Sequence, residues 1–467
     1  MKRTLAIIIG IVIMLGGCTL APKYRRPAAP VPGQWPTGAA YEGKAGETER
    51  KAASELPWRE FFIDERLQKL IDLALKNNRD LRLASLNVER ARALYGVQRA
   101  ELLPTVNAFG AGSKGRVPAD LSYTGQETTS QQYSVNFGVS SWEIDFFGRI
   151  RSLKDRALEE YLATGQARRS AQILLVSAVA NAYLTLAADR ESLKLTASTL
   201  AAQEGAYKLI KKRYDVGLAS EIDLRRAQSQ VDTARGDVAR YTQLIAQDEN
   251  ALQLLAGAPV PTELLPPELG AVPPLRNVFP GLSSEILLQR PDILAAEHRL
   301  KAANANIGAA RAAFFPRISL TTTFGTASAD LSGLFRDGSS TWNFAPQIVL
   351  PIFDARTWSL YDYTKVEKEI SITQYERTIQ TAFRETADAL AVQGTVSKQI
   401  EAQKSLVDAF AETYRLSGIR YAKGIDSYLS VLDAQRSLYG AQKVLINLQL
   451  LRLTNDVALY KALGGGA

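Results

Sequence analysis

Few side chains in this 467-residue chain have a type and spacing that could support catalysis. Glu143 and Asp145 lie near the end of a predicted strand, a place that favours a turn or rim feature over an acid–base pair. His298 is the single histidine, so no histidine-based metal cage can form, and it fits a helix face. No nucleophile motif, phosphate-binding loop or metal-ligand spacing occurs. We therefore predict no catalytic residue, no metal site and no enzymatic activity.

Cys18, the single cysteine, indicates a different chemistry. It follows a basic start, an apolar run over residues 5–15 and two glycines. That run is shorter than the ~20 residues that cross a bilayer, but it suits a signal peptide. The pattern resembles a bacterial lipoprotein signal, which predicts removal of residues 1–17 and a lipid such as palmitate on Cys18. Such a lipid anchors a chain to a leaflet without making it span. No other cofactor is expected.

The charge distribution excludes one class of partner. The chain has 56 basic and 48 acidic side chains, a net charge of +8, spread along the sequence without a basic block. Nucleic-acid binding favours a clustered basic patch, so no nucleic-acid partner is expected. A hydrophobic fraction of 46% is normal for a folded protein and excludes global disorder.

The chain contains an internal duplication. The same residue types recur at a constant shift of 207 positions, for example Gly217 with Gly424 and Ser220 with Ser427. The copies are separated by a proline-rich stretch. The predicted organisation is an acylated tether over 18–60, a first repeat over 61–258, a linker over 259–282 and a second repeat over 283–464.

Each copy contains long helices. Residues 150–214 contain no proline, and apolar residues recur there every seven positions from Val179 to Tyr214, which indicates a coiled-coil seam. A helix of that size is ~100 Å long, far beyond the usual globular helix. No segment after the signal peptide matches the length and purity of a transmembrane helix. A membrane-spanning part must therefore consist of β-strands.

Each copy also contains a candidate hairpin of alternating apolar and polar residues. The predicted strands cover 104–113, 133–139, 318–324 and 342–350, with polar loops at 114–130 and 329–340. Alternation also fits a soluble sheet with one buried face, but the lipid site and the long helices favour a membrane. Open edges are not tolerated in lipid, so the strands must close between subunits. Two chains would give eight strands, and three would give twelve with room for a pore.

With these features, five segments resemble the outer membrane factors, the TolC-like channels of tripartite efflux pumps, in the lipoprotein branch that serves drug exporters. The segments are Trp58–Phe62, Trp142–Arg149, Arg290–Asp292, Ala309–Pro316 and Leu432–Ser437. The resemblance implies a mixed membrane protein: a homotrimer whose 12-stranded transmembrane β-barrel continues into a periplasmic 12-helix α-barrel. It also implies a passive exit duct for drugs and other small molecules in the outer membrane. The expected partners are a periplasmic adaptor, an inner-membrane transporter and outer membrane lipid.

Such a tunnel must close at its periplasmic tip when at rest. The tips are expected at Gly217 and Gly424, where glycine can adopt the left-handed cap conformation. The resemblance implies that Leu429 and Asp433 face the pore and form constricting rings. Three Asp433 carboxylates near the axis would attract cations.

Two further positions match a hydrogen-bonded pair that holds the closed tip in the family, Asp223 and Tyr421. The arginine that assists this pair in some members is Asp426 here, so the link is either weaker or uses Arg436. Local readings stay open for both carboxylates. Asp223 also fits a helix cap with Ser220, and Asp433 fits a surface ion pair with Arg436.

The adaptor is expected to contact the corner residues of both hairpins, by resemblance and because exposed apolar residues at a tip favour a partner. These residues are Val216, Gly217, Leu218, Gly424 and Ile425. Two alternative functions stay open: a duct for protein secretion, and a lipoprotein coiled-coil scaffold without a pore.

Overall fold

The computed structural model describes residues 19–41, 56–278 and 283–466. These residues form two compact units, and each unit contains segments of both sequence repeats. The strand unit comprises residues 19–28, 87–164 and 295–375, and the hairpin unit comprises the other described residues.

Part of the predicted organisation falls outside the described residues. The signal peptide over 1–17 and the lipid site at Cys18 both do. The boundaries of the tether, the repeats and the linker stay predictions, because the compact units cut across both repeats.

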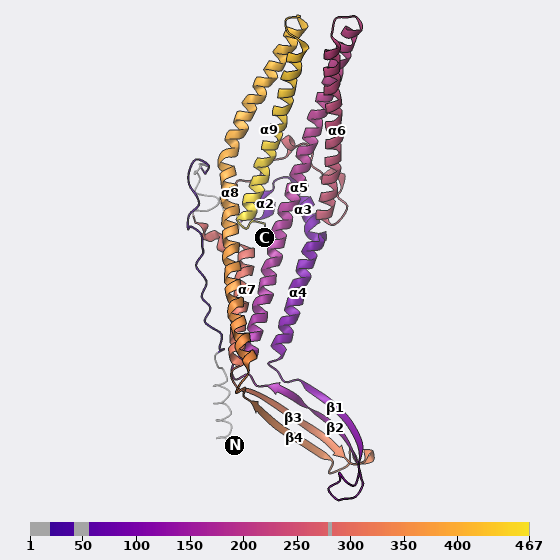
Figure 1. The fold of residues 1–467 in the computed structure, drawn as a ribbon, viewed down its shortest axis with the longest axis vertical. Helices are drawn as coiled ribbons and strands as arrows, with labels where there is room; N and C mark the ends of the chain where they lie inside the picture. Colours follow the sequence, from indigo (N-terminus) through magenta and orange to yellow (C-terminus); the bar gives the residue numbers. More distant parts are fainter. Residues whose placement is uncertain (1–18, 42–55, 279–282, 467) are drawn as a thin grey trace. The chain divides into compact units, whose positions relative to one another are not determined.

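The strand unit contains one antiparallel sheet in the order β1-β2-β3-β4 (Figure 1). Its strands are β1 (Val106–Val117), β2 (Thr128–Glu143), β3 (Arg317–Ser328) and β4 (Ser340–Val349). All four predicted strands are present. The loop predicted over 114–130 is wrong in length, because β1 continues to Val117, which pairs with Thr128. The polar side chains of this stretch do not stop the backbone from pairing.

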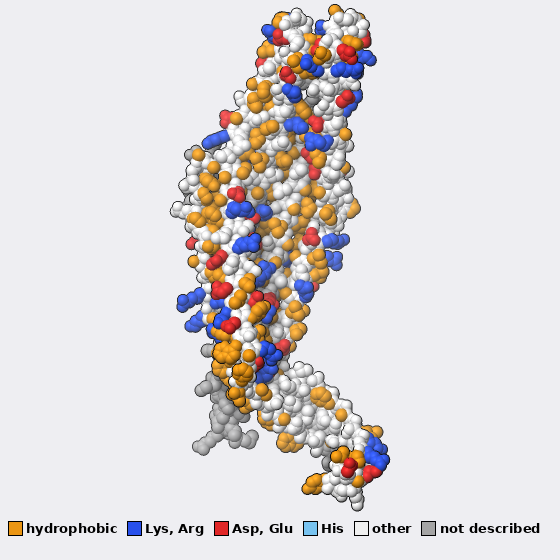
Figure 2. Space-filling view, in the orientation of Figure 1, with side chains coloured by type: hydrophobic (Ala, Val, Ile, Leu, Met, Phe, Trp, Pro, Cys, Tyr) orange, Lys and Arg blue, Asp and Glu red, His pale blue; other side chains and the backbone are white. Residues whose placement is uncertain are grey.

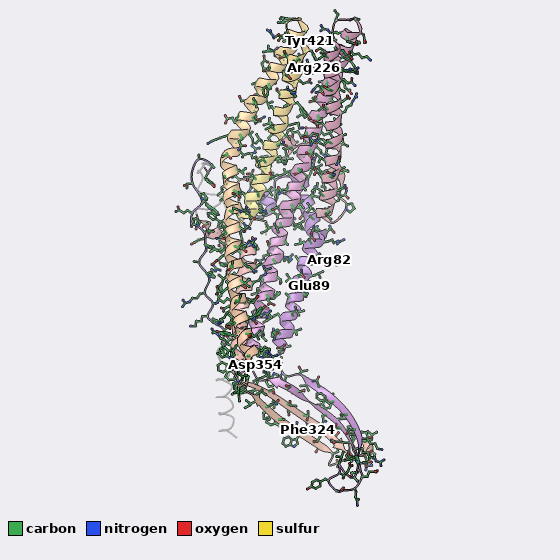
Figure 3. The ribbon with its side chains drawn as sticks, viewed as in Figure 1. Arg82, Glu89, Arg226, Phe324, Asp354 and Tyr421 are labelled. Carbon is green, nitrogen blue, oxygen red and sulfur yellow. The ribbon has the colours of Figure 1, made fainter. Side chains whose placement is uncertain are left out.

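The two faces of the sheet differ in polarity. Phe137, Phe324 and Trp342 are paired across β2, β3 and β4, so they share one face, with exposed fractions of 61%, 68% and 75%. Asn136 and Asn343 are one position out of phase and lie on the opposite face. Figure 2 shows apolar side chains at the surface of the sheet, and Figure 3 labels Phe324 on β3. The sheet is therefore amphipathic, and its apolar face is open.

Within the strand unit, the chain that follows the predicted lipid site is bound along the part of α7 (Pro291–Ala312) from residue 295 onward. The Arg26 guanidinium lies 2.6 Å from Glu297 Oε2, and the Tyr24 hydroxyl donates to Glu297 Oε1 at 3.2 Å. Asn304 Nδ2 donates to the carbonyl of Pro22 at 2.7 Å. The Glu297 side chain is only 4% exposed. Because a buried carboxylate needs its cation, this pair ties the first part of the tether to the fold.

Long helices form two antiparallel hairpins, α5 with α6 and α8 with α9 (Figure 1). The helices besides α7 are α2 (Trp58–Phe61), α3 (Glu65–Asn77), α4 (Arg79–Ala100), α5 (Arg149–Asp215), α6 (Glu221–Ala256), α8 (Ala355–Ala422) and α9 (Tyr428–Ala462). Short 3-10 helices cover Thr262–Leu264, Leu269–Ala271, Ser284–Gln289 and Leu331–Gly333. The helix predicted over 150–214 is confirmed as α5.

The duplication is visible in the backbone. Gly217 and Gly424, which end α5 and α8, have φ of 76° and 72°. Gly257 and Gly464, at the ends of α6 and α9, have φ of 65° and 82°. Glycines 207 positions apart therefore adopt the same left-handed conformation at the matching helix ends of the two copies.

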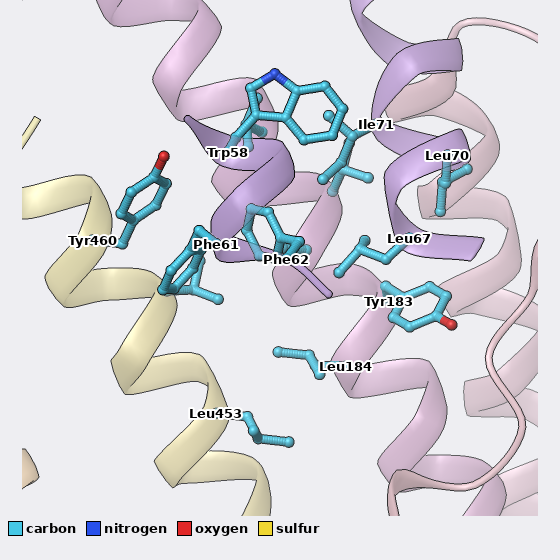
Figure 4. Close-up of a cluster of buried hydrophobic side chains, with 14 of the residues drawn as sticks. Trp58, Phe61, Phe62, Leu67, Leu70, Ile71, Tyr183, Leu184, Leu453 and Tyr460 are labelled. Atoms are coloured by element: carbon cyan, nitrogen blue, oxygen red, sulfur yellow. The ribbon is translucent and has the colours of Figure 1, made fainter. Parts of the chain in front are cut away.

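The core of the hairpin unit is aromatic (Figure 4). Phe61 of α2 is fully buried, and its ring stacks on Tyr460 of α9 with centroids 4.0 Å apart. The Tyr460 hydroxyl donates to the carbonyl of Leu56 at 2.5 Å. Tyr183 of α5 donates to Asp64 at 2.7 Å. The segment around Trp58–Phe62, which contains α2, is thus a core element that packs against both α5 and α9.

One sequence expectation about membrane helices needs correction. An 18-residue window within α5 has a mean hydropathy of 1.6, which is apolar enough for a membrane helix. However, 61% of this window is buried inside the chain. Its apolar composition reflects the packing of a core helix.

A pair of acids interrupts the apolar seam between α5 and α6. Asp189 lies three positions after seam residue Leu186, and Asp248 three positions after Ile245, so both face the hairpin interior. Oδ2 of Asp248 is closed to solvent and has no hydrogen-bond partner among the described residues. Burial and the neighbouring carboxyl of Asp189 raise the pKa of Asp248 to about 6, and burial also raises the pKa of Asp189.

The second copy does not repeat this acid pair. The equivalent positions hold Val396 and Asn455, both buried. Asn455 Nδ2 donates to the carbonyl of Ala389 at 3.0 Å. A neutral side chain therefore suits this place in the fold.

Asp248→Asn should remove a pH-dependent loss of stability. Since the folded-state pKa of Asp248 is raised, its contribution is fully present below about pH 4 and is lost as the pH rises toward 6. We expect the variant to be more stable than the wild type at pH 7.5, by on the order of 1–2 kcal/mol after solvent screening. The difference should vanish near pH 4. The measurement is the apparent Tm in detergent from pH 4 to 8.

The matched control is Asp232→Asn, an exposed carboxylate on the same helix, which should shift the Tm little at any pH. A variant Tm that runs parallel to that of the wild type across this range would show that the pair does not share a proton.

Candidate gate and docking residues at the hairpin turns

The two hairpin turns have the same backbone geometry. The amide of Gly217 donates to the carbonyl of Tyr214 at 2.9 Å, and that of Leu218 to Arg213 at 2.7 Å. The second turn repeats this pattern from Gly424 and Ile425, at 2.9 and 3.0 Å. These bonds form a Schellman motif, which needs a left-handed residue and therefore favours glycine. The positions predicted for the tips are confirmed as turns.

The predicted docking residues lie open at these turns. Val216 and Leu218 are each 69% exposed, and Ile425 is 58% exposed. Nothing lies within 4 Å of the position where a Cβ would stand on Gly217 or Gly424. Both corners thus present apolar side chains that this chain does not cover.

The two hairpins pack together beside the turns. Ile210 of α5, Ala227 of α6 and Val431 of α9 form a buried cluster with Tyr428 and Leu432. This packing selects one face of α6 and of α9 for burial, so the opposite faces stay open.

Leu429, Asp433 and Arg436 lie on the open face of α9. They are spaced at i, i+4 and i+7, so they form one line along the helix. Leu429 is 39% exposed, and Asp433 is paired with Arg436 at 3.2 Å, with side chains 56% and 72% exposed. The ion pair that the sequence left open is present. Because it is exposed, it leaves the Asp433 carboxylate accessible.

The expected hydrogen bond between Asp223 and Tyr421 is not among the contacts of the described residues. Asp223 instead accepts from the Ser220 hydroxyl at 2.7 Å, and its amide donates to Ser220 Oγ at 3.1 Å. This is the helix cap that the sequence offered as the local alternative. Tyr421 lies under the Arg213 guanidinium, with its ring centroid 5.0 Å from Cζ. Tyr421 is thus linked to the first copy by a cation–π contact.

The charge that replaces the expected arginine has its own partner. Asp426 accepts two hydrogen bonds from Arg420, at 2.6 and 3.0 Å, across the second turn. The arginine lowers the pKa of Asp426. Asp426 therefore stabilises its own turn, and Arg436 is paired with Asp433.

The remaining carboxylates that could do chemistry are neutralised by arginine. Glu143 is held by Arg149 through two bonds of 2.8 Å and by Arg317 at 3.2 Å, and Asp145 pairs with Arg151. These groups line an open cavity of about 750 Å³ at the end of the sheet.

His298 lies elsewhere in the strand unit, with its Nδ1 2.6 Å from Glu159 of α5. It is a helix-face residue, as the sequence indicated.

Comparison with known proteins supplies the family. The model named "Outer membrane efflux protein" matches residues 70–258 and 282–465. The chain belongs to the outer membrane efflux protein family. The two matched segments also show that both halves of the duplicated chain carry the family pattern.

Two relatives match this chain along almost its whole length. The chain is 52% identical over 455 residues to the antibiotic efflux pump outer membrane protein ArpC of Pseudomonas putida, and the match covers 97% of this chain and 93% of ArpC. It is 50% identical over 456 residues to the solvent efflux pump outer membrane protein SrpC of the same species, covering 97% and 96%.

A solved structure confirms the fold. The outer membrane channel MtrE of Neisseria gonorrhoeae matches with a TM-score of 0.85 and 38% identity, over 96% of this chain and 98% of that one. This efflux protein is therefore an outer membrane channel with a periplasmic helical extension, and not an enzyme. The alternative of a scaffold without a pore is wrong.

The sequence reasoning missed one set of exposed residues. Ile222 and Arg226 of α6 occupy the positions that Leu429 and Asp433 occupy on α9, and they are also exposed. The constant shift of the duplication was the signal that could have identified them.

Replacing the turn glycine should loosen the second corner. In Gly424→Ala, a side chain must adopt a φ near 72°, which costs about 1 kcal/mol. That corresponds to about fivefold faster hydrogen exchange at the Ile425 amide. The measurement is hydrogen–deuterium exchange of the detergent-solubilised channel. Gly418→Ala is the control on the same helix, where alanine is favoured and exchange should slow. Equal exchange in the two variants would contradict the role of the left-handed turn.

Proposed function

We propose that three copies of this chain form one outer membrane exit duct, with twelve strands around a pore and twelve helices around a tunnel. The carrying observation is the sheet. It has an open apolar face and two edge strands, β1 and β4, with no further partner strand among the described residues. In lipid, such edges must be paired, and only other copies of the chain supply matching strands.

Exposed apolar side chains on the helices of the strand unit support the same assembly. Leu94 and Val97 of α4 are 60% and 64% exposed, and Tyr363 and Val366 of α8 are 57% and 58% exposed. A periplasmic helix does not leave such rows in water. They fit the faces of neighbouring copies.

The resting gate is proposed on the open face of α9. Leu429 would form an apolar constriction, and Asp433 a ring of carboxylates that prefers cations. Arg436 would balance part of that charge. The exposed fractions of the three residues, 39% for Leu429, 56% for the Asp433 side chain and 72% for that of Arg436, support this role. Asp223 and Tyr421 would act indirectly, through the cap with Ser220 and the contact with Arg213.

The corner residues Val216, Leu218 and Ile425, with Gly217 and Gly424, are proposed as the adaptor contacts. The adaptor would connect the tip to an inner-membrane transporter, which supplies the energy. The names of ArpC and SrpC indicate antibiotics and solvents, so the proposed cargo is small and largely apolar. A role in protein secretion has no comparable support.

The gate proposal predicts a rise in conductance. Purified wild type in a planar bilayer should show small, cation-preferring single-channel currents. Leu429→Ala combined with Asp433→Ala should increase the conductance several-fold and weaken the cation preference, because both constricting rings are removed.

The matched control for the gate is Ile222→Ala combined with Arg226→Ala, the duplicate positions on α6. This variant should conduct like the wild type. Native mass spectrometry of the same samples should give the mass of three chains. A gate variant that conducts like the wild type would refute the assignment of the gate, and a monomeric mass would refute the shared barrel.

Lipid attachment is proposed at Cys18 and should depend on its thiol. Intact-mass analysis of the mature wild type is expected to show residues 1–17 removed and acyl chains present. The Cys18→Ser variant should lack both changes. The control variant Thr19→Ser, which retains Cys18, should show both. Identical processing of Cys18→Ser and the wild type would rule out this site.

A further inference from the structure

The first hairpin carries a cluster of cations that its second copy lacks. Lys208, Lys211 and Lys212 lie near the end of α5, at a spacing that places them on one side of the helix, and Arg226 lies in the second turn of α6. All four are exposed, and none has an ion-pair partner within the described residues. Figure 2 shows Lys and Arg side chains gathered at the end of the α5–α6 hairpin.

Nearby carboxylates do not neutralise this cluster. Glu204, one turn before Lys208, is paired with Arg235 of α6 at 2.8 Å. Glu221 is paired with Arg225 at 3.3 Å. Asp223 is part of the Ser220 cap, and Asp215 makes no recorded ion pair with the lysines.

In the second hairpin, the equivalent positions hold either a paired cation or no cation. At the position of Lys208 it has Arg415, which is paired with Glu412 at 2.7 Å. At the positions of Lys211 and Lys212 it has Gly418 and Ile419, and at that of Arg226 it has Asp433. Lys404 and Lys423, which are far apart in the sequence, have no ion-pair partner within the described part of this hairpin. A group of neighbouring unpaired cations is therefore specific to the first copy and is not a requirement of the turn.

Like charges on neighbouring helical positions repel each other, so the cluster costs stability unless something else compensates it. Beside it lie apolar groups that are also uncovered: Leu209 is 54% exposed, Ile222 is 63% exposed, and Val216 and Leu218 lie at the turn. A surface with an apolar centre and a cationic side fits a protein segment with apolar residues flanked by Asp and Glu.

We infer that the end of the α5–α6 hairpin docks an acidic segment of the adaptor through Lys208, Lys211, Lys212 and Arg226. The inference rests on the proposed docking of an adaptor at the tips and adds the chemistry of the partner. The two hairpins then present different surfaces: the first a cationic surface, the second one whose arginines are internally paired. The adaptor would distinguish them by charge.

The test uses the purified full-length channel in detergent and the purified adaptor of the same pump. Binding is measured by biolayer interferometry at 50 and 500 mM NaCl. Lys208→Glu combined with Lys211→Glu and Lys212→Glu should weaken binding at least ~10-fold at 50 mM NaCl, and by less than ~3-fold at 500 mM, because salt screens the charges.

The matched control reverses the same number of charges on the second hairpin, at Lys404, Arg415 and Lys423. These residues are exposed, and their reversal should change the affinity less than threefold. Equal losses in both triple variants would overturn the inference, since they would indicate a general charge effect. An unchanged affinity in the first variant would also overturn it.

Two further readouts separate the possible failures. Carbodiimide joins a lysine amine only to a carboxyl in contact, so mapped cross-links from Lys208, Lys211 or Lys212 to Asp or Glu of the adaptor are expected. Adaptor binding without such cross-links would refute the acidic partner. A wild-type channel that conducts but never binds the adaptor would refute the proposed docking itself. Loss of the trimer in the triple variant would assign the lysines to contacts between copies of this chain.

Discussion

The unpaired backbone of the two edge strands is the constraint on which the rest of this molecule depends. A β-strand in lipid must satisfy every amide and carbonyl through another strand, and β1 and β4 of one chain cannot do this for each other across a four-stranded sheet. Pairing between copies of the chain follows from this requirement. Once three copies share a barrel, the helices that continue from the strands must surround the same axis, and the open apolar rows on α4 and α8 acquire partners.

The duplication provides two hairpins with one backbone and two surfaces. The Schellman turns at Gly217 and Gly424 have similar φ values and the same hydrogen-bond pattern, because this geometry depends on the backbone alone. The side chains around them have diverged. On α9 the open face holds Leu429 and Asp433, whereas on α6 the same positions hold Ile222 and Arg226. A gate and a docking surface can therefore arise from one repeated fold without altering its turns.

Polar contacts inside the fold set alignment as well as stability. The acids Asp189 and Asp248 both occur within an apolar seam, where burial raises the pKa of each carboxyl group. Glu297 plays a comparable part for the segment after Cys18, because its buried carboxylate pairs with Arg26 of that segment as well as with Lys301 of α7. Both interactions use a group whose charge is costly to bury, so both favour one arrangement over a shifted one.

The elements and turns of this chain were readable from its sequence, because periodicity and glycine act locally. The seven-residue seam predicted α5, the alternating residues predicted four strands, and the constant shift of 207 positions predicted matching corners. The partners of individual charges were readable only in part. The sequence offered Ser220 or Tyr421 as the partner of Asp223, and it gave no indication that Tyr421 packs under Arg213 or that Asp248 lies near Asp189. Those choices depend on distances between helices, which only tertiary packing determines, since an ion pair or hydrogen bond is lost over a few ångströms.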